Sequence, residues 1–333
     1  MHNLKLWNAP KKENNLTKFT NSLKNYSIFH SYFDLHKWSI ENKNDFWKEV
    51  WKFTKIIGDL KGRIYSHNKE FIKCNFFKDS RINYSENCLS KKDDTDAIIF
   101  YSESKLRRSF SWSQLRDKVF KFSYFLKNTI NIKKSDRIAA ILPNLPETVV
   151  SFLATSQIGA IWSSCSSDFG KKAVIDRFKQ IKPKVLIVTD YYYYNKKKFD
   201  TTHIVSQILE NISSIENIIV IPYEKERANL KVEFEYIEWD TIQNSKNKNE
   251  KFEKFEFNHP LYILYSSGTT GVPKCIVHGA GGSLIQHKKE HQLHCNIKEN
   301  DRVFYFTTCG WMMWNWLISA LSSKASIVLF DGS

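Results

Sequence analysis

Glycine, proline and closely spaced cysteines are all scarce in this chain of 333 residues. Only 11 glycines and 7 prolines are present, which excludes a collagen-like or linker-dominated architecture. The six cysteines lie far apart and form no C-x-x-C pair, so their spacing indicates reduced thiols rather than a disulfide framework. The first twenty residues are polar and lack the apolar segment of a secretory signal. We therefore expect a cytoplasmic protein.

Aromatic side chains and lysine are abundant instead. Aromatic residues make up 15% of the chain, hydrophobic residues 42% and charged residues 26%, which is ordinary globular usage. The length suggests about two domains. The net charge is +15, and most of the excess is lysine spread along the whole chain. Without an arginine-rich arm or zinc-finger spacing, this pattern favours a solvated lysine-rich surface over a dedicated polyanion surface. We expect no nucleic-acid partner.

One long uncharged segment raises the question of a membrane span. Residues 303–323 carry no charge, and a run of about 18 apolar residues is the usual sign of a transmembrane helix. The segment contains several serines and threonines, however, and begins with strand-like alternation. It predicts a buried strand, a loop and a helix rather than a membrane span.

Short apolar runs alternate with amphipathic segments after residue 95. The expected strands cover residues 97–101, 137–142, 185–189, 218–221, 231–239, 261–265, 303–307 and 327–330. The expected helices cover residues 46–57, 113–130, 146–158, 173–180, 202–212 and 283–295. Such alternation predicts an α/β fold with a largely parallel sheet, in which ligands bind beyond the carboxyl ends of the strands.

The strongest local signal is the segment 265–274, which reads Tyr-Ser-Ser-Gly-Thr-Thr-Gly-Val-Pro-Lys and follows an expected strand. Its glycines permit close backbone approach, and its hydroxyl and backbone N–H groups are donors for phosphate oxygens. Lys274 adds a positive charge. The segment is not a Walker A loop, because Gly268, Gly271 and Lys274 are each three residues apart. Composition predicts a polyphosphate site and leaves a plain turn as the alternative.

The segment resembles the phosphate loop of the adenylate-forming enzymes, the superfamily of acyl-CoA synthetases, adenylation domains and luciferases. It matches the pattern aromatic-Ser/Thr-Ser-Gly-Ser/Thr-Thr-Gly-x-Pro-Lys at every position. The resemblance implies catalytic roles for Lys274 and Thr270, with Thr270 also helping to hold magnesium. It implies contacts to the phosphates of ATP from Ser266, Ser267, Gly268, Thr269, Thr270, Gly271 and Lys274.

Other segments extend the resemblance along nearly the whole chain. Residues 46–47 and 82–87 look like the N-terminal region of acetyl-CoA and acetoacetyl-CoA synthetases, and residues 110–116, 136–139 and 142–144 look like the start of their large domain. The implied organisation is a helical N-terminal region, residues 1–95, followed by an AMP-binding large domain, residues 96–333, with mostly parallel sheets flanked by helices.

Three further stretches, residues 162–170, 277–282 and 306–315, resemble acetoacetyl-CoA synthetases in particular. Acetyl-CoA synthetases have a Val-Thr-Gly-His type of sequence after the Gly-Trp pair that stands here at Gly310 and Trp311. The resemblance implies that Trp311, Met312 and Met313 line the acyl pocket, with ordinary core packing as the alternative.

The segment 191–198 is harder to interpret. In acetyl-CoA synthetase relatives the corresponding stretch approaches the phosphates of coenzyme A with arginines, whereas this chain has Tyr194 and Lys197 near those places. The resemblance makes Lys197 a candidate contact for coenzyme A. A solvated loop and a stacking surface for single-stranded nucleic acid remain alternatives.

The segment 287–291 fits the H-x-x-E-H pattern of inverted zinc peptidases. Helical spacing would place His287 and His291 on one face. The segment lies in the helix expected after the phosphate loop, and the resemblance accounts for it without a metal.

The resemblance implies an ATP-dependent ligase that converts acetoacetate to acetoacetyl-AMP and then to acetoacetyl-CoA. The implied ligands are ATP, Mg²⁺ and coenzyme A. The alternatives are a ligase for acetate or propionate, and a non-catalytic nucleotide-binding remnant. The resemblance also implies that the large domain is incomplete at residue 333 and that the small C-terminal domain is absent. We therefore expect little or no turnover from these 333 residues alone.

Overall fold

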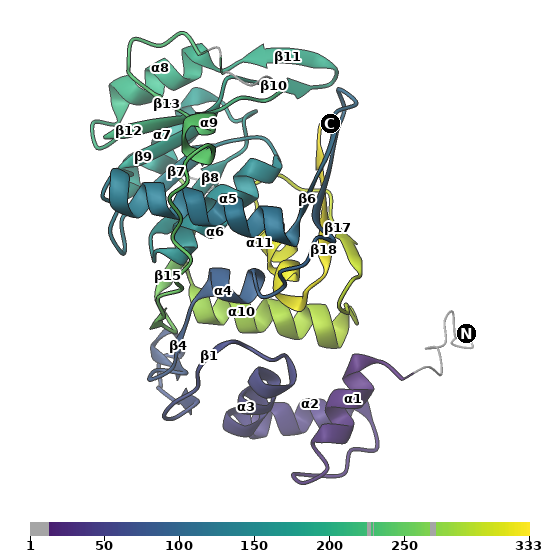
Figure 1. Ribbon diagram of the computed structural model, residues 1–333. Coiled ribbons are helices and arrows are strands. Elements are labelled where there is room, and N and C mark those ends of the chain that lie inside the picture. The colour runs from purple at the N-terminus through teal and green to yellow at the C-terminus, as the bar shows by residue number, and fades with distance from the viewer. Residues whose placement is uncertain (1–12, 225–227, 229, 267–270) are drawn as a thin grey trace, which may run out of the picture.

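Two sheets surrounded by helices make up the body of the molecule (Figure 1). The computed structural model describes residues 13–224, 228, 230–266 and 271–333. The larger sheet has the strand order β13-β12-β9-β7-β8-β15-β16, and the smaller has the order β17-β18-β5-β6. Neighbouring strands are parallel except for the pairs β15–β16 and β5–β6. The predicted α/β fold with mostly parallel sheets is thereby confirmed.

The strands of the larger sheet are β7 (Arg137–Ile141), β8 (Ile161–Cys165), β9 (Val185–Thr189), β12 (Asn217–Ile221), β13 (Ile237–Glu238), β15 (Pro260–Tyr265) and β16 (Cys275–Gly279). Those of the smaller sheet are β5 (Asp96–Ser102), β6 (Arg107–Ser111), β17 (Arg302–Phe304) and β18 (Ser326–Asp331). The helices that follow residue 95 are α5 (Trp112–Tyr124), α6 (Pro146–Gln157), α7 (Lys171–Ile181), α8 (Thr202–Asn211), α9 (Trp239–Gln243), α10 (Ala280–Lys289) and α11 (Met312–Ser319).

The larger sheet is covered on both faces, which explains why its central strands read as continuous apolar runs. Every residue of β8 and β9 is buried. In β7, Ile138 and Ala140 face the core formed with α5 and α6, whereas Ala139 and Ile141 face the core formed with α7 and α8. This alternation follows from the two-residue period of a strand. The two cores fix the orientation of the sheet between its helices.

The N-terminal region packs beneath the sheets in the view of Figure 1 and shares their core. The ring of Phe257 lies 4.6 Å from that of Phe77 and 6.0 Å from that of Trp51, measured between centroids. The elements of this region are α1 (Asn15–Ser22), α2 (Tyr32–Glu41), α3 (Lys43–Phe53), β1 (Gly58–Asp59), β2 (Tyr65–Ser66), η1 (Phe71–Lys73), β3 (Asn75–Phe76), β4 (Arg81–Ile82) and α4 (Tyr84–Cys88). A later strand, β14 (Phe255–Glu256), pairs with β4.

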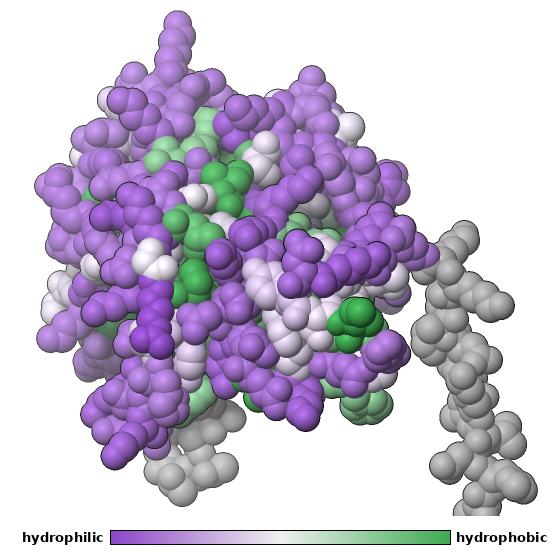
Figure 2. Space-filling view, turned by 90° about the horizontal axis from the view of Figure 1, so that it is seen from below, coloured by the Kyte–Doolittle hydropathy of each residue, from purple (hydrophilic) through white to green (hydrophobic). Residues whose placement is uncertain are grey.

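The lower face of the molecule is largely hydrophilic (Figure 2). Hydrophobic side chains appear on it only as separate patches. Among the residues that the structure describes, no helix combines the length and the hydrophobicity needed to span a membrane.

Several predicted boundaries were wrong, each for a local reason. The strand expected at 303–307 ends at Phe304, because the carbonyl of Thr307 instead accepts a hydrogen bond from Asn144. The strand expected at 231–239 is reduced to β13, which pairs with β12 through two residues only. The helix expected at 46–57 is α3, which ends at Phe53, and Lys55 then adopts a positive φ of 54°.

Two other segments contain helical turns that the apolar pattern does not reveal. The segment expected as one helix at 113–130 is α5 followed by a π-helical turn, η2 (Phe125–Thr129). Likewise, α10 continues into a π-helical turn, η3 (Glu290–His294). A 3₁₀ turn, η4 (Ala320–Ser323), follows α11.

The segment 191–198 belongs to an antiparallel hairpin of β10 (Tyr191–Tyr194) and β11 (Lys197–Asp200).

Two adjacent glycines in α10 provide a direct test of how this helix packs on the N-terminal core. A Cβ atom at Gly281 would overlap the ring of Phe257, whereas a Cβ atom at Gly282 would meet nothing within 4 Å. We expect Gly281→Ala to lower the free energy of unfolding by about 1–3 kcal/mol because of overpacking. The matched control Gly282→Ala should be neutral or stabilising by up to about 1 kcal/mol, because alanine favours a helix. Urea unfolding measures both, and equal effects would contradict this packing.

Candidate functional site

Loops that follow the parallel strands meet at the carboxyl edge of the larger sheet. The hydroxyl of Ser164 donates to the carbonyl of Cys309 (2.6 Å), and the Cys309 thiol donates to the carbonyl of Leu142 (3.0 Å). A Cβ atom at Gly310 would lie 3.2 Å from the backbone nitrogen of Ser166. Two of the three stretches singled out in the sequence, 162–170 and 306–315, are therefore in direct contact.

The third stretch, 277–282, lies on the neighbouring strand and the helix that follows it. The ring of His278 stacks on that of Tyr262, with 4.8 Å between centroids. Tyr262 in turn pairs in register with Trp162 of β8. The three stretches thus belong to adjacent parts of one sheet and its connections.

The phosphate-loop segment connects β15 and β16. Of its predicted phosphate contacts, the structure describes Ser266, Gly271 and Lys274, whereas Ser267, Gly268, Thr269 and Thr270 lie outside the described residues. The Ser266 N–H donates to the carbonyl of Lys274 (3.0 Å), which closes the base of the hairpin. Gly271 has a φ of +156°, which side-chain-bearing residues rarely adopt, and Lys274 is exposed. The hairpin therefore presents a lysine at the carboxyl edge of the sheet.

An arginine missed by the sequence analysis lies beneath this hairpin. The guanidinium of Arg177 in α7 lies 5.6 Å from the ring centroid of Tyr265 and 5.2 Å from that of Phe169. From the same helix, the Gln180 amide donates to the carbonyl of Pro273 (2.8 Å). Burial raises the pKa of Tyr265, so its phenol stays neutral and its hydroxyl hydrogen-bonds with Ser163 (3.0 Å). The helix thus anchors the loop and adds a cation close to it.

The residues predicted for the acyl pocket begin α11. Trp311 is 60% exposed and Met312 is 44% exposed, while Met313 is half-buried. Their positions beside the Cys309–Gly310 turn bring them close to the end of β8. The side chain that enters the core is the next one, Trp314, which is fully buried.

A buried polar network fixes the start of α11 relative to both sheets. Asn144 accepts a hydrogen bond from the indole N–H of Trp314 (2.9 Å) and donates to the carbonyls of Thr307 (3.3 Å) and Phe330 (3.2 Å). Its backbone N–H donates to the carboxyl of Asp331 (3.3 Å). Asn144 belongs to the segment 142–144 that resembles the start of the large domain, but its role as a bridge depends on contacts that span 187 residues.

Asp331, at the end of β18, is the most perturbed carboxyl group at this edge. Burial is the main cause that raises its pKa to about 6, and the hydroxyl of Tyr223 donates to it (2.7 Å), which opposes the rise. Burial and the nearby carboxyl also raise the pKa of Tyr223. This pair cannot be recognised in the sequence, because an aspartate at the end of a strand carries no distinguishing pattern.

The candidate coenzyme A contact, Lys197, lies at the turn end of the β10–β11 hairpin, opposite Tyr194. Both side chains are exposed. The hairpin extends toward the C-terminal end of the chain (Figure 1), and the backbone N–H of Asn195 donates to the hydroxyl of Ser333 (3.1 Å). The segment is an ordered hairpin at the same edge as the phosphate loop.

Metal ligands are sparse in the part of the chain that the structure describes, where no group of three or more His, Cys, Asp or Glu side chains is suited to hold a metal ion. His287 and His291 do lie on one helical face, with 6.3 Å between ring centroids. The Nδ1 atom of His287 is paired with the hydroxyl of Ser319 (2.8 Å). Burial lowers the pKa of His287 to about 4 and that of His291 to about 3, so both are neutral.

Comparisons with known proteins agree with this geometry. A family model described as AMP-binding enzyme matches residues 85–333. The acetoacetyl-coenzyme A synthetase of Rhizobium meliloti (strain 1021) is 43% identical over 318 residues, which cover 95% of this chain and 48% of the relative. The acetoacetyl-CoA synthetase of Gallus gallus is 40% identical over 314 residues, covering 91% and 47% respectively. The chain spans about half the length of these curated relatives.

A solved structure extends the similarity to three dimensions. The acetoacetyl-CoA synthetase from Streptomyces lividans superposes with a TM-score of 0.89 at 32% identity, covering 96% of this chain and 50% of that chain. The similarity therefore includes the N-terminal helices as well as the two sheets.

The neutral histidines make stability depend on pH. The pKa of His291 is about 3 in the folded chain, below its ordinary value of 6.5, so between these values the unfolded chain binds the proton more readily. Stability from this group is complete above pH 6.5 and is lost as the pH falls. Relative to His291→Phe, the parent chain should lose about 2 kcal/mol of unfolding free energy between about pH 7.5 and about pH 5.

Urea unfolding at each pH measures this difference. The control is the exposed His203→Gln, which should follow the parent chain at every pH. A parent chain that keeps a constant difference from His291→Phe across this range would show that the imidazole is not held neutral.

Proposed function

The chain belongs to the AMP-binding enzyme family, and we propose that it forms the nucleotide-binding part of an ATP-dependent acid–thiol ligase. The proposed substrates are acetoacetate, ATP and coenzyme A, and the proposed products are acetoacetyl-CoA, AMP and pyrophosphate. The observation that carries the proposal is the β15–β16 hairpin, which places the phosphate-loop sequence at the carboxyl edge of a parallel sheet. The identity to acetoacetyl-CoA synthetases supports the choice of acid.

The proposed reaction has two steps. In the first, a carboxylate oxygen of acetoacetate forms a bond to the α-phosphorus of ATP, and the bond from that phosphorus to pyrophosphate breaks. In the second, the thiolate sulfur of coenzyme A forms a bond to the acyl carbon, and AMP leaves with the oxygen of the broken acyl–oxygen bond. Both steps depend on positioning and charge neutralisation rather than on a covalent enzyme intermediate.

We assign the charge-neutralising roles to the phosphate loop. Lys274 and Thr270 would act on the phosphates during transfer, and the other contacts would come from Ser266, Ser267, Gly268, Thr269 and Gly271. Magnesium, held with the help of Thr270, would neutralise phosphate charge when bound. Arg177 would add positive potential beneath the loop.

The cysteines have no role in this mechanism. All six are free. Burial raises the pKa of Cys309 to about 12, and it also raises the pKa of Cys165, so neither is a thiolate at neutral pH.

The contacts for the two other substrates are assigned by position. Trp311, Met312 and Met313 would line the acyl site, since the turn before them packs on the end of β8. Lys197 would contact coenzyme A from the β10–β11 hairpin. We further propose a helical N-terminal region at residues 1–95, a large domain at residues 96–333, and a cytoplasmic location for a chain with six free thiols.

Removal of the loop lysine should weaken nucleotide binding. We expect Lys274→Gln to raise the Kd for MgATP about tenfold, because a charge-assisted contact to phosphate is lost. Lys92→Gln is the matched control, since it removes the same charge beside the amino end of β5, away from this edge. Isothermal titration calorimetry on the 333-residue chain measures both. Equal affinities in all three proteins would remove the basis of the nucleotide site.

The choice of acid is tested by ATP–pyrophosphate exchange with a panel of acids, run on the full-length gene product rather than on these 333 residues alone. We expect acetoacetate to support faster exchange than acetate or propionate, because the stretches around the acyl site resemble acetoacetyl-CoA synthetases. Faster exchange with acetate or propionate would assign the ligase to another acid. MgATP binding without exchange in the presence of any acid would indicate a non-catalytic nucleotide-binding protein.

A further inference from the structure

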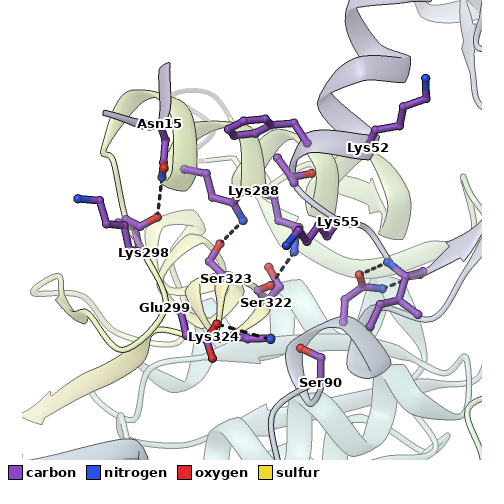
Figure 3. A pocket seen from close by; sticks show the side chains of 16 residues that line it. Asn15, Lys52, Lys55, Ser90, Lys288, Lys298, Glu299, Ser322, Ser323 and Lys324 are labelled. Carbon is purple, nitrogen blue, oxygen red and sulfur yellow. Dashed lines mark hydrogen bonds and ion pairs between the residues drawn. The ribbon is translucent and has the colours of Figure 1, made fainter. Parts of the chain in front are cut away.

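A cavity of about 790 Å³ lies between the N-terminal helices and the large domain (Figure 3). Its walls come from the end of α3, the second half of α10 and the turn η4. None of the described residues of the phosphate loop lines it. Lys288, on its wall, lies roughly 12 Å along α10 from the start of that helix beside β16. The cavity is therefore separate from the site proposed for ATP.

The lining is strongly basic. It contains five lysines and one glutamate, namely Lys52, Lys55, Lys288, Lys298, Lys324 and Glu299. Figure 3 shows Lys55 and Lys288 near the centre of the view, with Lys52 and Lys298 extended toward its edges. The ammonium group of Lys324 lies 3.6 Å from the carboxylate of Glu299, and the two side chains form an exposed ion pair at this wall. The positive charge of the lining thus exceeds its negative charge by a wide margin.

Lys288 is an unusual feature of this wall, because it is only 3% exposed. Its ammonium group donates to the carbonyl of Ser322 (2.6 Å), which satisfies one of its three N–H donors. No carboxylate of the described residues forms an ion pair with Lys288 or Lys55. Burial lowers the pKa of Lys288 to about 8, so the group is still mostly charged at neutral pH. A buried cation without a counter-charge is costly, and an anionic ligand would remove that cost.

The remaining lining suits an organic molecule rather than a bare inorganic ion. Phe53, Ile57 and Ile297 provide apolar surface, and Asn15 and Gln292 provide amide groups. The volume is within the usual range for small-molecule sites, about 300–1,000 Å³, and far exceeds that of a single phosphate.

We propose that this cavity binds a nucleoside diphosphate or a phosphorylated molecule of that size, with its phosphates held by Lys55, Lys288 and Lys324. The site is distinct from the phosphate loop, and it stands or falls independently of the ligase assignment. Five of the lysines that the composition predicts to be spread over the surface thus line one cavity.

The test is calorimetric titration of the 333-residue chain and its variants with ADP and with GDP. In Lys274→Gln, which impairs the phosphate loop, we expect saturable binding of at least one of these nucleotides to persist. Adding Lys55→Gln or Lys288→Met to that variant should weaken this binding about tenfold each, because each removes a charged contact to phosphate. Raising the salt concentration should weaken it as well.

Lys48→Gln is the matched control, because it removes the same charge from α3, shortly before Lys55 in the chain, but does not line the cavity. Lys55 is exposed, so its replacement does not endanger the fold, and Lys288→Met keeps an unbranched buried side chain, one atom shorter, while removing its charge. The proposal is overturned if no ADP or GDP binding survives Lys274→Gln, or if the surviving binding is unchanged by both cavity variants. Loss of MgATP binding at Lys274 alone would leave this site standing.

Discussion

Asn144 connects the two sheets, and the geometry of the candidate site depends on that connection. It follows β7 of the larger sheet, yet its side chain and backbone bond to β18 of the smaller sheet and to Trp314 of α11. The hydrogen-bonding groups of such a buried amide must be paired, because unpaired polar groups are costly in the core. The network therefore holds α11, and with it Trp311 and Met312, at one position relative to the two sheets.

The cations at the two proposed sites differ in their exposure to solvent, and this difference fits the different functions proposed for the two sites. At the carboxyl edge, Lys274 is exposed and Arg177 lies beneath the same hairpin, so positive potential is available to a ligand that enters from solvent. Below the sheets, Lys288 is buried, and no carboxylate of the described residues forms an ion pair with it. The first arrangement suits a substrate that must arrive and leave during each turnover. The second suits a ligand that stabilises the packing of the N-terminal helices on the rest of the molecule.

The parts of this structure that were predictable from sequence are those encoded by short-range patterns. The apolar run of β9, the buried helical segment of α6 and the ten-residue phosphate loop are all local signals, and the first two were confirmed. Residues 267–270 lie outside the described residues, so the individual contacts of the loop stay predictions. What the sequence did not reveal depends on distant contacts: Arg177 beneath Tyr265, Asp331 beside Tyr223, and a lysine cavity whose walls are more than 200 residues apart in the chain.

Hydrogen–deuterium exchange with and without MgATP tests the central claim most directly, because it reports which backbone amides the nucleotide contacts. The account predicts slower exchange in the peptide that spans β15, the phosphate loop and β16. Unchanged exchange in that peptide at saturating MgATP, or protection confined to other segments, would contradict the assignment of this hairpin to ATP.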